Sequence, residues 1–283
     1  MNPVILDGKK TGKEIREELA LKTAQLKEKY GRVPGLAVIL VGNDNASSVY
    51  VRNKKLACDE VGFYSEVYTL PEETTEEEVL SLIGELNSRN DIHGILVQMP
   101  LPRHISPEKV ISAISPLKDV DAFSEQNTGK IMIGNYAFLP CTPAGIMALL
   151  ERYGISPAGK NAVVIGRSNI VGKPMSMLLL HANATVTICH SRTVNLSEIT
   201  KNADILVSAV GKAGFVSADM VKEGAVVIDV GMNRNSEGRL CGDVLFDEVK
   251  EKASYITPVP GGVGPMTITM LMKNTLTAFL MTV

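Results

Sequence analysis

Apolar and polar residues follow two different spacings along the chain, and these predict alternating helices and strands. Residues 11–29 place Ile15, Leu19 and Leu26 among many charges, which is the spacing of an amphipathic helix. The continuous apolar run at 36–41 predicts a buried strand. The same alternation fills the first half of the chain. It predicts a parallel sheet with right-handed crossovers through helices.

The remaining elements of the first half follow from similar patterns. We expect a helix that carries Tyr50 and Lys54 with Ser47 or Ser48 as its N-cap, a strand at 63–70, a helix at 75–87, a strand at 94–99 and a short helix that Ser106 caps. Residues 118–143 are irregular and rich in Gly, Asn and Pro, which predicts a linker with site loops at its edges.

The second half is a more regular series of strands and helices. A helix opens at Thr142 and runs to residue 150, and another runs from Lys173 to about 181. Strands are expected at 162–165, 185–189, 205–209, 226–230 and 254–256, and a final helix at 267–280. This alternation predicts a doubly wound, Rossmann-like domain.

A chain of 283 residues is long for a single core, so we expect an α/β protein of two domains. The N-terminal catalytic domain, with its parallel sheet, comprises residues 1–141. The final helix, within 266–283, is expected to pack back onto it. Residues 142–265 form the Rossmann-like nucleotide-binding domain. A cleft is expected between the two.

Composition and charge exclude several classes of function. The formal net charge is −2 and the isoelectric point about 6.1, so nothing favours nucleic acid or an anionic membrane as a partner. The longest apolar stretches have the length of strands, so we expect no membrane span. No export or transit segment is evident at the start, and we expect a cytoplasmic protein.

Cysteine and histidine usage argues against a metal site. The four cysteines are widely scattered, at positions 58, 141, 189 and 241, without a Cys-x-x-Cys pair or a Cys/His cluster. Their expected role is structural, as reduced and mostly buried thiols. The four histidines also lack the spacing of metal ligands, and we expect no metal.

One glycine-rich loop has the features of a nucleotide-binding turn. A strand ending at Ile165 leads into Gly166-x-Ser168-x-x-x-Gly172, and a helix follows. Gly166 permits the tight turn, the small Ser168 permits backbone to approach a pyrophosphate, and Gly172 permits close packing of helix on strand. The motif is one residue longer than Gly-x-Gly-x-x-Gly and has Ser in place of the second Gly. The strand and helix around it therefore carry the prediction of dinucleotide binding.

The residues after the second strand of this domain indicate which dinucleotide binds. Domains that prefer NAD usually have an acidic residue there, which holds the ribose 2′-hydroxyl. This chain has Ser191 and Arg192 instead, and Arg167 lies in the loop. These side chains suit a 2′-phosphate, which predicts NADP rather than NAD. The alternative is that Arg192 is a solvated surface cation.

Tyr50 and Lys54 are the leading catalytic candidates. Four residues apart, they share one helix face, where a phenol and an ammonium group can hold a substrate oxygen and move a proton. Because they precede the glycine loop, they are expected on a different domain from the nucleotide. On spacing alone a solvated helix face is the commoner explanation. Gln98, however, lies at the end of an apolar strand and Asp121 at the start of the linker, and both are positions where a parallel sheet opens its ligand crevice.

Together these motifs resemble the bifunctional methylenetetrahydrofolate dehydrogenase/methenyltetrahydrofolate cyclohydrolase family (the FolD type) over essentially the whole chain. The motifs that carry the resemblance are Val41-Gly42-x-x-x-Ala46-Ser47-x-x-Tyr50-Val51, Gln98-x-Pro100-Leu101-Pro102, Lys118-Asp119-Val120-Asp121, Pro140-Cys141-Thr142-Pro143, Gly166-Arg167-Ser168-x-x-Val171-Gly172-x-Pro174 and the Pro/Gly-rich segment 258–267. Two departures are Ala122, where the family usually has Gly, and Met99, where it usually has Leu.

The resemblance implies NADP-dependent oxidation of 5,10-methylenetetrahydrofolate, followed by hydrolysis of the methenyl product to 10-formyltetrahydrofolate. Lys54 matches the catalytic lysine, which requires a lowered pKa to act as a base. Gln98 would orient Lys54, Tyr50 would contact the substrate, and Asp121 would bind the pterin. The residues expected to line the folate are Pro100, Gly262 and Pro265. The family is usually homodimeric.

Two other interpretations remain open at this point. The first is a short-chain-type dehydrogenase with a tyrosine acid, which the order of the motifs disfavours because its Tyr would follow the glycine loop. The second is a nucleotide-sensing or scaffold protein with a vestigial site. The presence of Tyr50, Lys54, Gln98 and Asp121 together disfavours this second interpretation.

Overall fold

The computed structural model describes residues 3–283, except for the side chains of residues 45 and 46. Residues 1 and 2, with which the expected first domain begins, and the Ala46 side chain of the first motif lie outside the described part. The chain forms two compact units. One comprises Met1–Gly12 and Thr142–Thr267, and the other Lys13–Cys141 and Ile268–Val283. We call them the six-stranded and the three-stranded unit after their main sheets.

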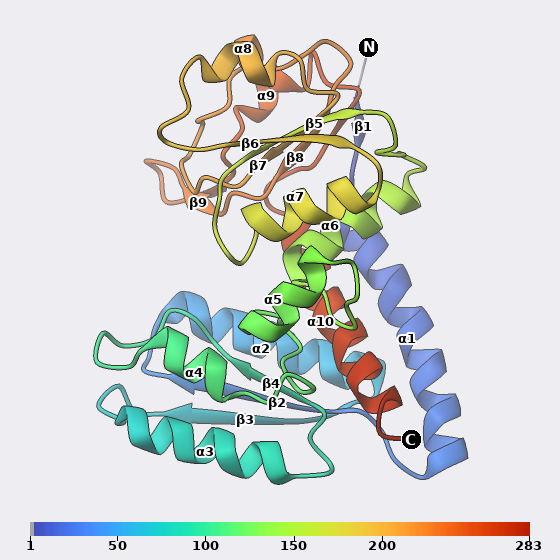
Figure 1. Cartoon of the computed structure of the whole chain (residues 1–283), viewed down its shortest axis with the longest axis vertical. Coiled ribbons are helices and arrows are strands. Elements are labelled where there is room, and N and C mark those ends of the chain that lie inside the picture. Colours follow the sequence, from blue (N-terminus) through green and yellow to red (C-terminus); the bar gives the residue numbers. More distant parts are fainter. Residues whose placement is uncertain (1–2) are drawn as a thin grey trace. The chain divides into compact units, whose positions relative to one another are not determined.

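The three-stranded unit is built on a parallel sheet, as predicted. Its strands are β2 (Gly35–Val41), β3 (Tyr64–Leu70) and β4 (Gly94–Val97), in the order β3-β2-β4 (Figure 1). Its helices are α1 (Gly8–Tyr30), which begins in the other unit, α2 (Asn45–Val61), α3 (Glu76–Ser88), α4 (Pro107–Ala113), α5 (Glu125–Met132) and the end of α10 (Val263–Leu280).

Alternation along β2 explains how this sheet is covered. All seven residues of β2 are buried. Ala37, Ile39 and Val41 point to one face, where they pack in a cluster with side chains of α3 and α4. The helix α2 covers the opposite face, and its Cys58 sulfur lies 3.6 Å from the Met272 sulfur of α10. Burial of both faces explains why β2 is a continuous apolar run.

The N-cap predicted for α4 is confirmed, and α3 begins with a cap that was not predicted. Thr75 forms a capping box with Glu78, and Ser106 caps α4 ahead of Pro107. The predicted N-cap of α2, Ser47 or Ser48, is wrong. Asp44 occupies that position, and its carboxylate accepts the backbone N–H of Ser47 at 2.7 Å. A carboxylate earlier in the chain competes for the same exposed N–H groups, and spacing alone does not separate the candidates.

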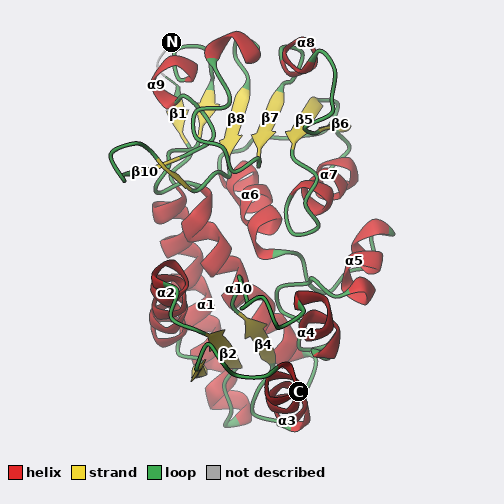
Figure 2. Ribbon diagram, turned by 90° about the vertical axis from the view of Figure 1, so that its left-hand side faces the viewer, coloured by secondary structure: helices red, strands yellow, loops and turns green. Residues whose placement is uncertain are grey.

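The six-stranded unit has the expected doubly wound topology. Its parallel strands are β1 (Val4–Ile5), β5 (Asn161–Ile165), β6 (Thr185–Cys189), β7 (Ile205–Ser208), β8 (Val226–Asp229) and β11 (Tyr255–Ile256), in the order β1-β11-β8-β7-β5-β6 (Figure 2). Read from β6 to β11, this is the order 2-1-3-4-5. The chain reverses direction across the sheet between β5 and β7, which is where such sheets bind ligands.

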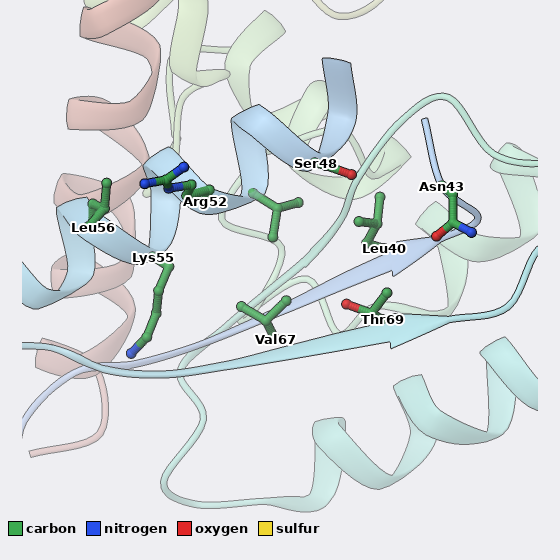
Figure 3. A pocket seen from close by; sticks show the side chains of 9 residues that line it. Leu40, Asn43, Ser48, Arg52, Lys55, Leu56, Val67 and Thr69 are labelled. Atoms are coloured by element: carbon green, nitrogen blue, oxygen red, sulfur yellow. The ribbon is translucent and has the colours of Figure 1, made fainter. Parts of the chain in front are cut away.

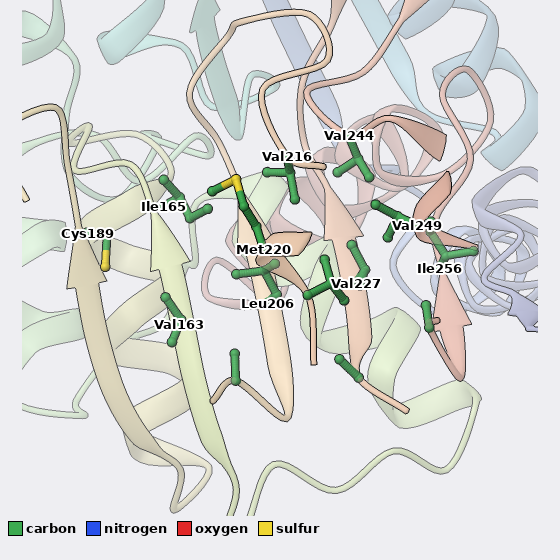
Figure 4. Packing of buried hydrophobic residues seen from close by; sticks show 14 residues of the cluster. Val163, Ile165, Cys189, Leu206, Val216, Met220, Val227, Val244, Val249 and Ile256 are labelled. Carbon is green, nitrogen blue, oxygen red and sulfur yellow. The ribbon is translucent and has the colours of Figure 1, made fainter. Parts of the chain in front are cut away.

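Short elements complete this unit. They are the helices α6 (Cys141–Arg152), α7 (Gly172–His181), α8 (Leu196–Thr200) and α9 (Phe246–Val249), a 3₁₀ turn at Ala218–Met220, and the hairpin of β9 (Asn233–Arg234) and β10 (Leu240–Cys241). Apolar side chains of β5, β7 and β8, among them Val163, Leu206 and Val227, meet Met220 and Val249 in a single cluster (Figure 4). This core holds β5, whose carboxyl end leads into the glycine loop, and its neighbouring strands in place.

The first strand joins the six-stranded unit. Val4 pairs with Tyr255 and Ile5 with Ile256, whereas these residues were expected in the N-terminal domain with the rest of residues 1–141. A strand of two residues is too short to give a periodic pattern. The functional division of the chain into a folate-binding and an NADP-binding domain stays a prediction. Among residues 3–283, none of the helices combines the length and apolar composition that a membrane crossing requires.

Candidate active site

The helix α2 and the end of β4 bring Lys54 and Gln98 together. Lys54 Nζ donates a hydrogen bond to Gln98 Oε1 at 2.8 Å. The Gln98 backbone N–H donates to the Ile39 carbonyl, which continues the sheet, and its side-chain Nε2 donates to the Met99 carbonyl at 2.6 Å. These bonds turn the amide oxygen of Gln98 toward the lysine. Tyr50 lies one turn earlier on α2, as the four-residue spacing predicted.

The surroundings of Lys54 favour its neutral form. Burial lowers the pKa of its ammonium group below the ordinary value, while the charge of Asp121 acts in the opposite direction. Burial also raises the pKa of Asp121, and Lys54 opposes that shift. Burial raises the pKa of Tyr50 as well, so its phenol keeps its proton. The site therefore combines a proton-holding phenol, an amine of reduced basicity and a carboxyl group.

Asp121 lies on a tightly held loop after α4. Asp119 accepts backbone N–H groups from Phe123 and Ser124 at 3.2 and 2.9 Å, which fixes the chain just after Asp121. Ala122, which lies between Asp121 and Phe123, has a φ of 57°, in the left-handed region that favours glycine. This conformation gives a physical reason why glycine suits the position.

Cys141 contacts the site in a way that its sequence position did not predict. The Cys141 sulfur lies 3.6 Å from Asp121 Oδ1 and 3.5 Å from the Val120 carbonyl oxygen. Burial, and then the charge of Asp121, raises the pKa of this thiol well above its ordinary value, so it is a neutral donor rather than a nucleophilic thiolate. The only sequence signal for it was its place in the motif Pro140-Cys141-Thr142-Pro143.

The glycine loop has the close packing that its sequence predicted. Gly166 has a φ of 130°, and a Cβ on it would lie 2.5 Å from the Ala209 carbonyl oxygen. A Cβ on Gly172 would lie 2.3 Å from the Gly166 carbonyl oxygen. Ser168 also has a role that was not foreseen. Its hydroxyl accepts the backbone N–H groups of Val171 and Gly172 at 3.2 and 3.3 Å, at the start of α7.

Two arginines flank the carboxyl ends of β5 and β6. Ile165 and Cys189 are paired at the ends of these strands, so Arg167 and the segment of Ser191 and Arg192 leave the same edge of the sheet. All three side chains are exposed. A bare loop, a helix N-terminus and two cations at one edge suit a phosphorylated dinucleotide.

The other predicted folate-lining residues lie in two different places. Pro100 is exposed directly after the Gln98 segment, in the three-stranded unit. Gly262 and Pro265 belong to the six-stranded unit. There a Cβ on Gly262 would lie 2.6 Å from the Pro258 carbonyl oxygen, and Pro265 lies in the first turn of α10.

Two family models match the chain. A tetrahydrofolate dehydrogenase/cyclohydrolase catalytic domain matches residues 6–121, and the NAD(P)-binding domain of the same family matches residues 140–283. The chain belongs to this family. It is a bifunctional dehydrogenase/cyclohydrolase, which confirms the resemblance and the expected fold class.

Individual relatives agree with this assignment over almost their full length. The bifunctional protein FolD of Streptococcus sanguinis is 61% identical over 97% of both chains. The crystal structure of the bifunctional FolD enzyme from Campylobacter jejuni has a TM-score of 0.97 at 50% identity and covers 99% of both chains. The Trypanosoma brucei FolD structure, which is complexed with NADP cofactor and an inhibitor, has a TM-score of 0.96 at 42% identity and covers 100% of this chain and 99% of its own.

Proposed function

We propose that this chain oxidises 5,10-methylenetetrahydrofolate to the methenyl compound and hydrolyses that product to 10-formyltetrahydrofolate, with Lys54 as the base of the second reaction. The observation that carries the proposal is the bond between Lys54 Nζ and the oriented amide oxygen of Gln98, beside Asp121. An amine of lowered pKa held by a neutral acceptor suits proton transfer near neutral pH.

In the oxidation, the residues of the chain act by positioning the substrate. The lone pair of a folate nitrogen drives loss of the hydride, so orientation contributes more than acid–base help. NADP, when bound, supplies the hydride acceptor. We assign Asp121 to the pterin amino group and ring N–H, because a carboxylate accepts paired donors well. Tyr50, Pro100, Gly262 and Pro265 are assigned to the remaining folate surface.

In the hydrolysis, a water molecule attacks the amidinium carbon of the methenyl cation. The neutral amine of Lys54 removes a proton from that water as the C–O bond forms. Lys54 then returns this proton to the folate nitrogen as the bond from that nitrogen to the same carbon breaks and the ring opens. The hydroxyl proton of the intermediate leaves to solvent as the formyl C=O forms, so one proton is released overall. Gln98 accepts one N–H of Lys54, which fixes the direction of the nitrogen lone pair. The positive charge of the substrate would lower the pKa of Lys54 further.

Residues at one edge of the six-stranded sheet would hold the cofactor. We assign Gly166, Ser168 and Gly172 to the pyrophosphate, at the N-terminus of α7. Arg167, Ser191 and Arg192 are assigned to the 2′-phosphate of NADP. The close approaches at Gly166 and Gly172 support this assignment, because side chains there would fill the loop.

A paired assay on one preparation tests the proposal. Production of NADPH from methylenetetrahydrofolate measures the dehydrogenase, and decay of the methenyl absorbance measures the cyclohydrolase. We expect both activities. A preparation that is folded and saturated with NADP and folate, yet lacks the second activity, would refute the role of this site in hydrolysis.

We further propose that two copies of the chain associate in the cytoplasm. The strand β3 is at the edge of its sheet, and a cavity of about 330 Å³ lies between it and α2 (Figure 3). Exposed apolar side chains lie along these two elements, namely Val49, Leu56, Tyr64 and Val67. An open strand edge beside apolar groups is suited to being covered by a partner. Light scattering with size-exclusion chromatography measures the oligomeric state. A strictly monomeric species at micromolar concentration would contradict the proposed dimer.

A further inference from the structure

Asn274, on the C-terminal helix α10, bonds to the segments that carry Asp121 and Cys141. It is 7% exposed. Its Nδ2 donates to the Val120 carbonyl oxygen at 2.7 Å and to the Leu139 carbonyl oxygen at 2.8 Å. The same nitrogen is 3.7 Å from the Cys141 sulfur. Both protons of one amide are therefore used on two backbone segments far apart in sequence.

These two carbonyls are next to the groups of the site. The Val120 carbonyl belongs to the peptide bond that links Val120 to Asp121, and Leu139 lies two residues before Cys141. Since the Cys141 sulfur in turn contacts both Asp121 Oδ1 and the Val120 carbonyl oxygen, the amide closes a ring of contacts around Asp121. Asn274 is thus hydrogen-bonded to the peptide group that directly precedes Asp121. The carboxyl group of Asp121 in turn acts on the pKa of Lys54.

Residues other than Asn274 also hold the loop that carries Asp121. Asp119 binds the backbone after it, as described above, and also accepts the Asn127 amide at 2.9 Å. Lys118 Nζ bonds to the carbonyls of Leu86 and Arg89 at the end of α3. The Lys118 carbonyl accepts the backbone N–H of Ile95 in β4. Asn274 supplies the support from α10.

We infer that Asn274 is a positioning residue for the folate reactions, which holds the Asp121 carboxyl group at the place where it meets both the pterin and Lys54. The inference rests on the proposed role of Asp121. Without the amide, the buried Val120 carbonyl keeps only the weak Cys141 thiol as a donor, and the part-buried Leu139 carbonyl loses the bond from Asn274. Such groups move toward other partners rather than stay unpaired. The Val120–Asp121 peptide would turn, and the carboxyl group would turn with it.

The test compares Asn274→Leu, which has a similar volume and no donor, with Thr275→Val. Thr275 is the next residue of α10, is fully buried, and bonds only to the Leu271 carbonyl among the contacts described for it. In Asn274→Leu we expect a KM for methylenetetrahydrofolate at least tenfold higher than in the unchanged protein, with the KM for NADP changed less than twofold. In Thr275→Val both KM values stay within twofold, even where Tm falls equally.

Two further variants distinguish the inference from the proposed function. Asn274→Ser keeps one donor and is expected to show an intermediate rise, which keeps the test usable if the leucine variant fails to fold. Asp121→Ala should show the folate defect by itself, and adding Asn274→Leu or Asn274→Ser should then add less than a twofold effect. If Asp121→Ala shows the defect and folded Asn274 variants bind folate normally, the inference is overturned. If Asp121→Ala binds folate normally, the proposed role of Asp121 fails and the inference fails with it.

Discussion

Lys54 and Gln98 meet through a single hydrogen bond of 2.8 Å that joins a helix to the end of a neighbouring strand. The amide of Gln98 has its own Nε2 tied to the Met99 carbonyl, so its oxygen is directed toward the lysine. A neutral acceptor leaves the charge of Lys54 uncompensated at this contact. Burial can therefore lower its pKa, which a carboxylate in the place of Gln98 would oppose.

Replacing Lys54 by Met should separate the two activities. We expect the cyclohydrolase rate to fall by about 10²–10⁴, the usual contribution of a positioned base, while part of the dehydrogenase activity remains. Lys55→Met is the matched control, because Lys55 is the next residue on α2 and pairs with Asp59 at 2.9 Å. Both variants are assayed for NADPH formation and methenyl decay. Parallel loss of the two activities, or of neither, would remove Lys54 from the hydrolysis.

Replacing Asp121 by Ala should weaken folate binding. A hydrogen bond to a charged group contributes about 1.5–3 kcal/mol, so loss of even one of the two assigned bonds should raise the folate Kd roughly 10- to 100-fold. Asp59→Ala, on the exposed face of α2, serves as the control. Equilibrium binding of a folate analogue measures the effect directly. An unchanged Kd in the Asp121 variant contradicts the assignment.

Replacing Arg192 by Gln should reduce the preference for NADP over NAD. Loss of a charge-assisted bond to the 2′-phosphate is expected to lower kcat/KM with NADP by about 10-fold or more and to leave the value with NAD nearly constant. Arg239→Gln is the control, because it removes the same charge elsewhere in the six-stranded unit, where the Arg239 side chain is 74% exposed. A preference that is equally strong in the Arg192 variant and the control would show that Arg192 is only a surface cation.

His93 should make the protein less stable in acid. Its Nδ1 accepts the Gly35 N–H at 3.0 Å, and its buried Nε2 finds no hydrogen-bond partner among the described residues. The His93 ring packs in a T-shaped arrangement with Phe279, with the ring centroids 4.9 Å apart. Burial lowers the pKa of His93 to about 4. The unfolded chain takes up this proton near pH 6.5, so stability falls as the pH drops from about 6.5 to 4, by up to ~3 kcal/mol.

The comparison with His93→Gln isolates this effect. Glutamine keeps an acceptor for the Gly35 N–H and does not titrate. Burial raises the pKa of Asp229 to about 6, which gives the opposite pH dependence between about pH 4 and 6, but this contribution is common to both proteins. Urea unfolding between pH 7.5 and 4 measures the difference. Parallel pH curves for the two proteins would exclude His93 as its source.

Long buried strands and well-capped helices could be predicted from the sequence, because each has its own pattern. The run at 36–41 becomes β2 with one added residue, and 185–189 becomes β6 without change. The linker prediction missed α5, since Ile131 is the only apolar side chain that this helix buries. The two-residue strands β1, β9 and β10 are defined by pairing with distant segments, which local pattern does not reveal.

The candidate site was predictable where chemistry follows from local spacing or from strand ends. The four-residue spacing gave Tyr50 and Lys54, and the end of β4 gave Gln98. Cys141 contacts Asp121 although the two are 20 residues apart in sequence. Asn274 bonds to Val120 across 154 residues. Neither residue has a spacing relation to the others. Only tertiary packing brings them to Asp121.

The three-stranded unit takes its last segment, Ile268–Val283, from the end of the chain. That segment supplies the Phe279 ring beside His93, the Met272 sulfur beside Cys58 and the amide of Asn274. During synthesis on the ribosome, this unit must therefore wait for residues 268–283 to emerge before its core and its site can close. A fragment cut at residue 141 would lack all three contacts, so the part of the chain that carries Lys54 cannot be expressed alone as a continuous piece with its native packing.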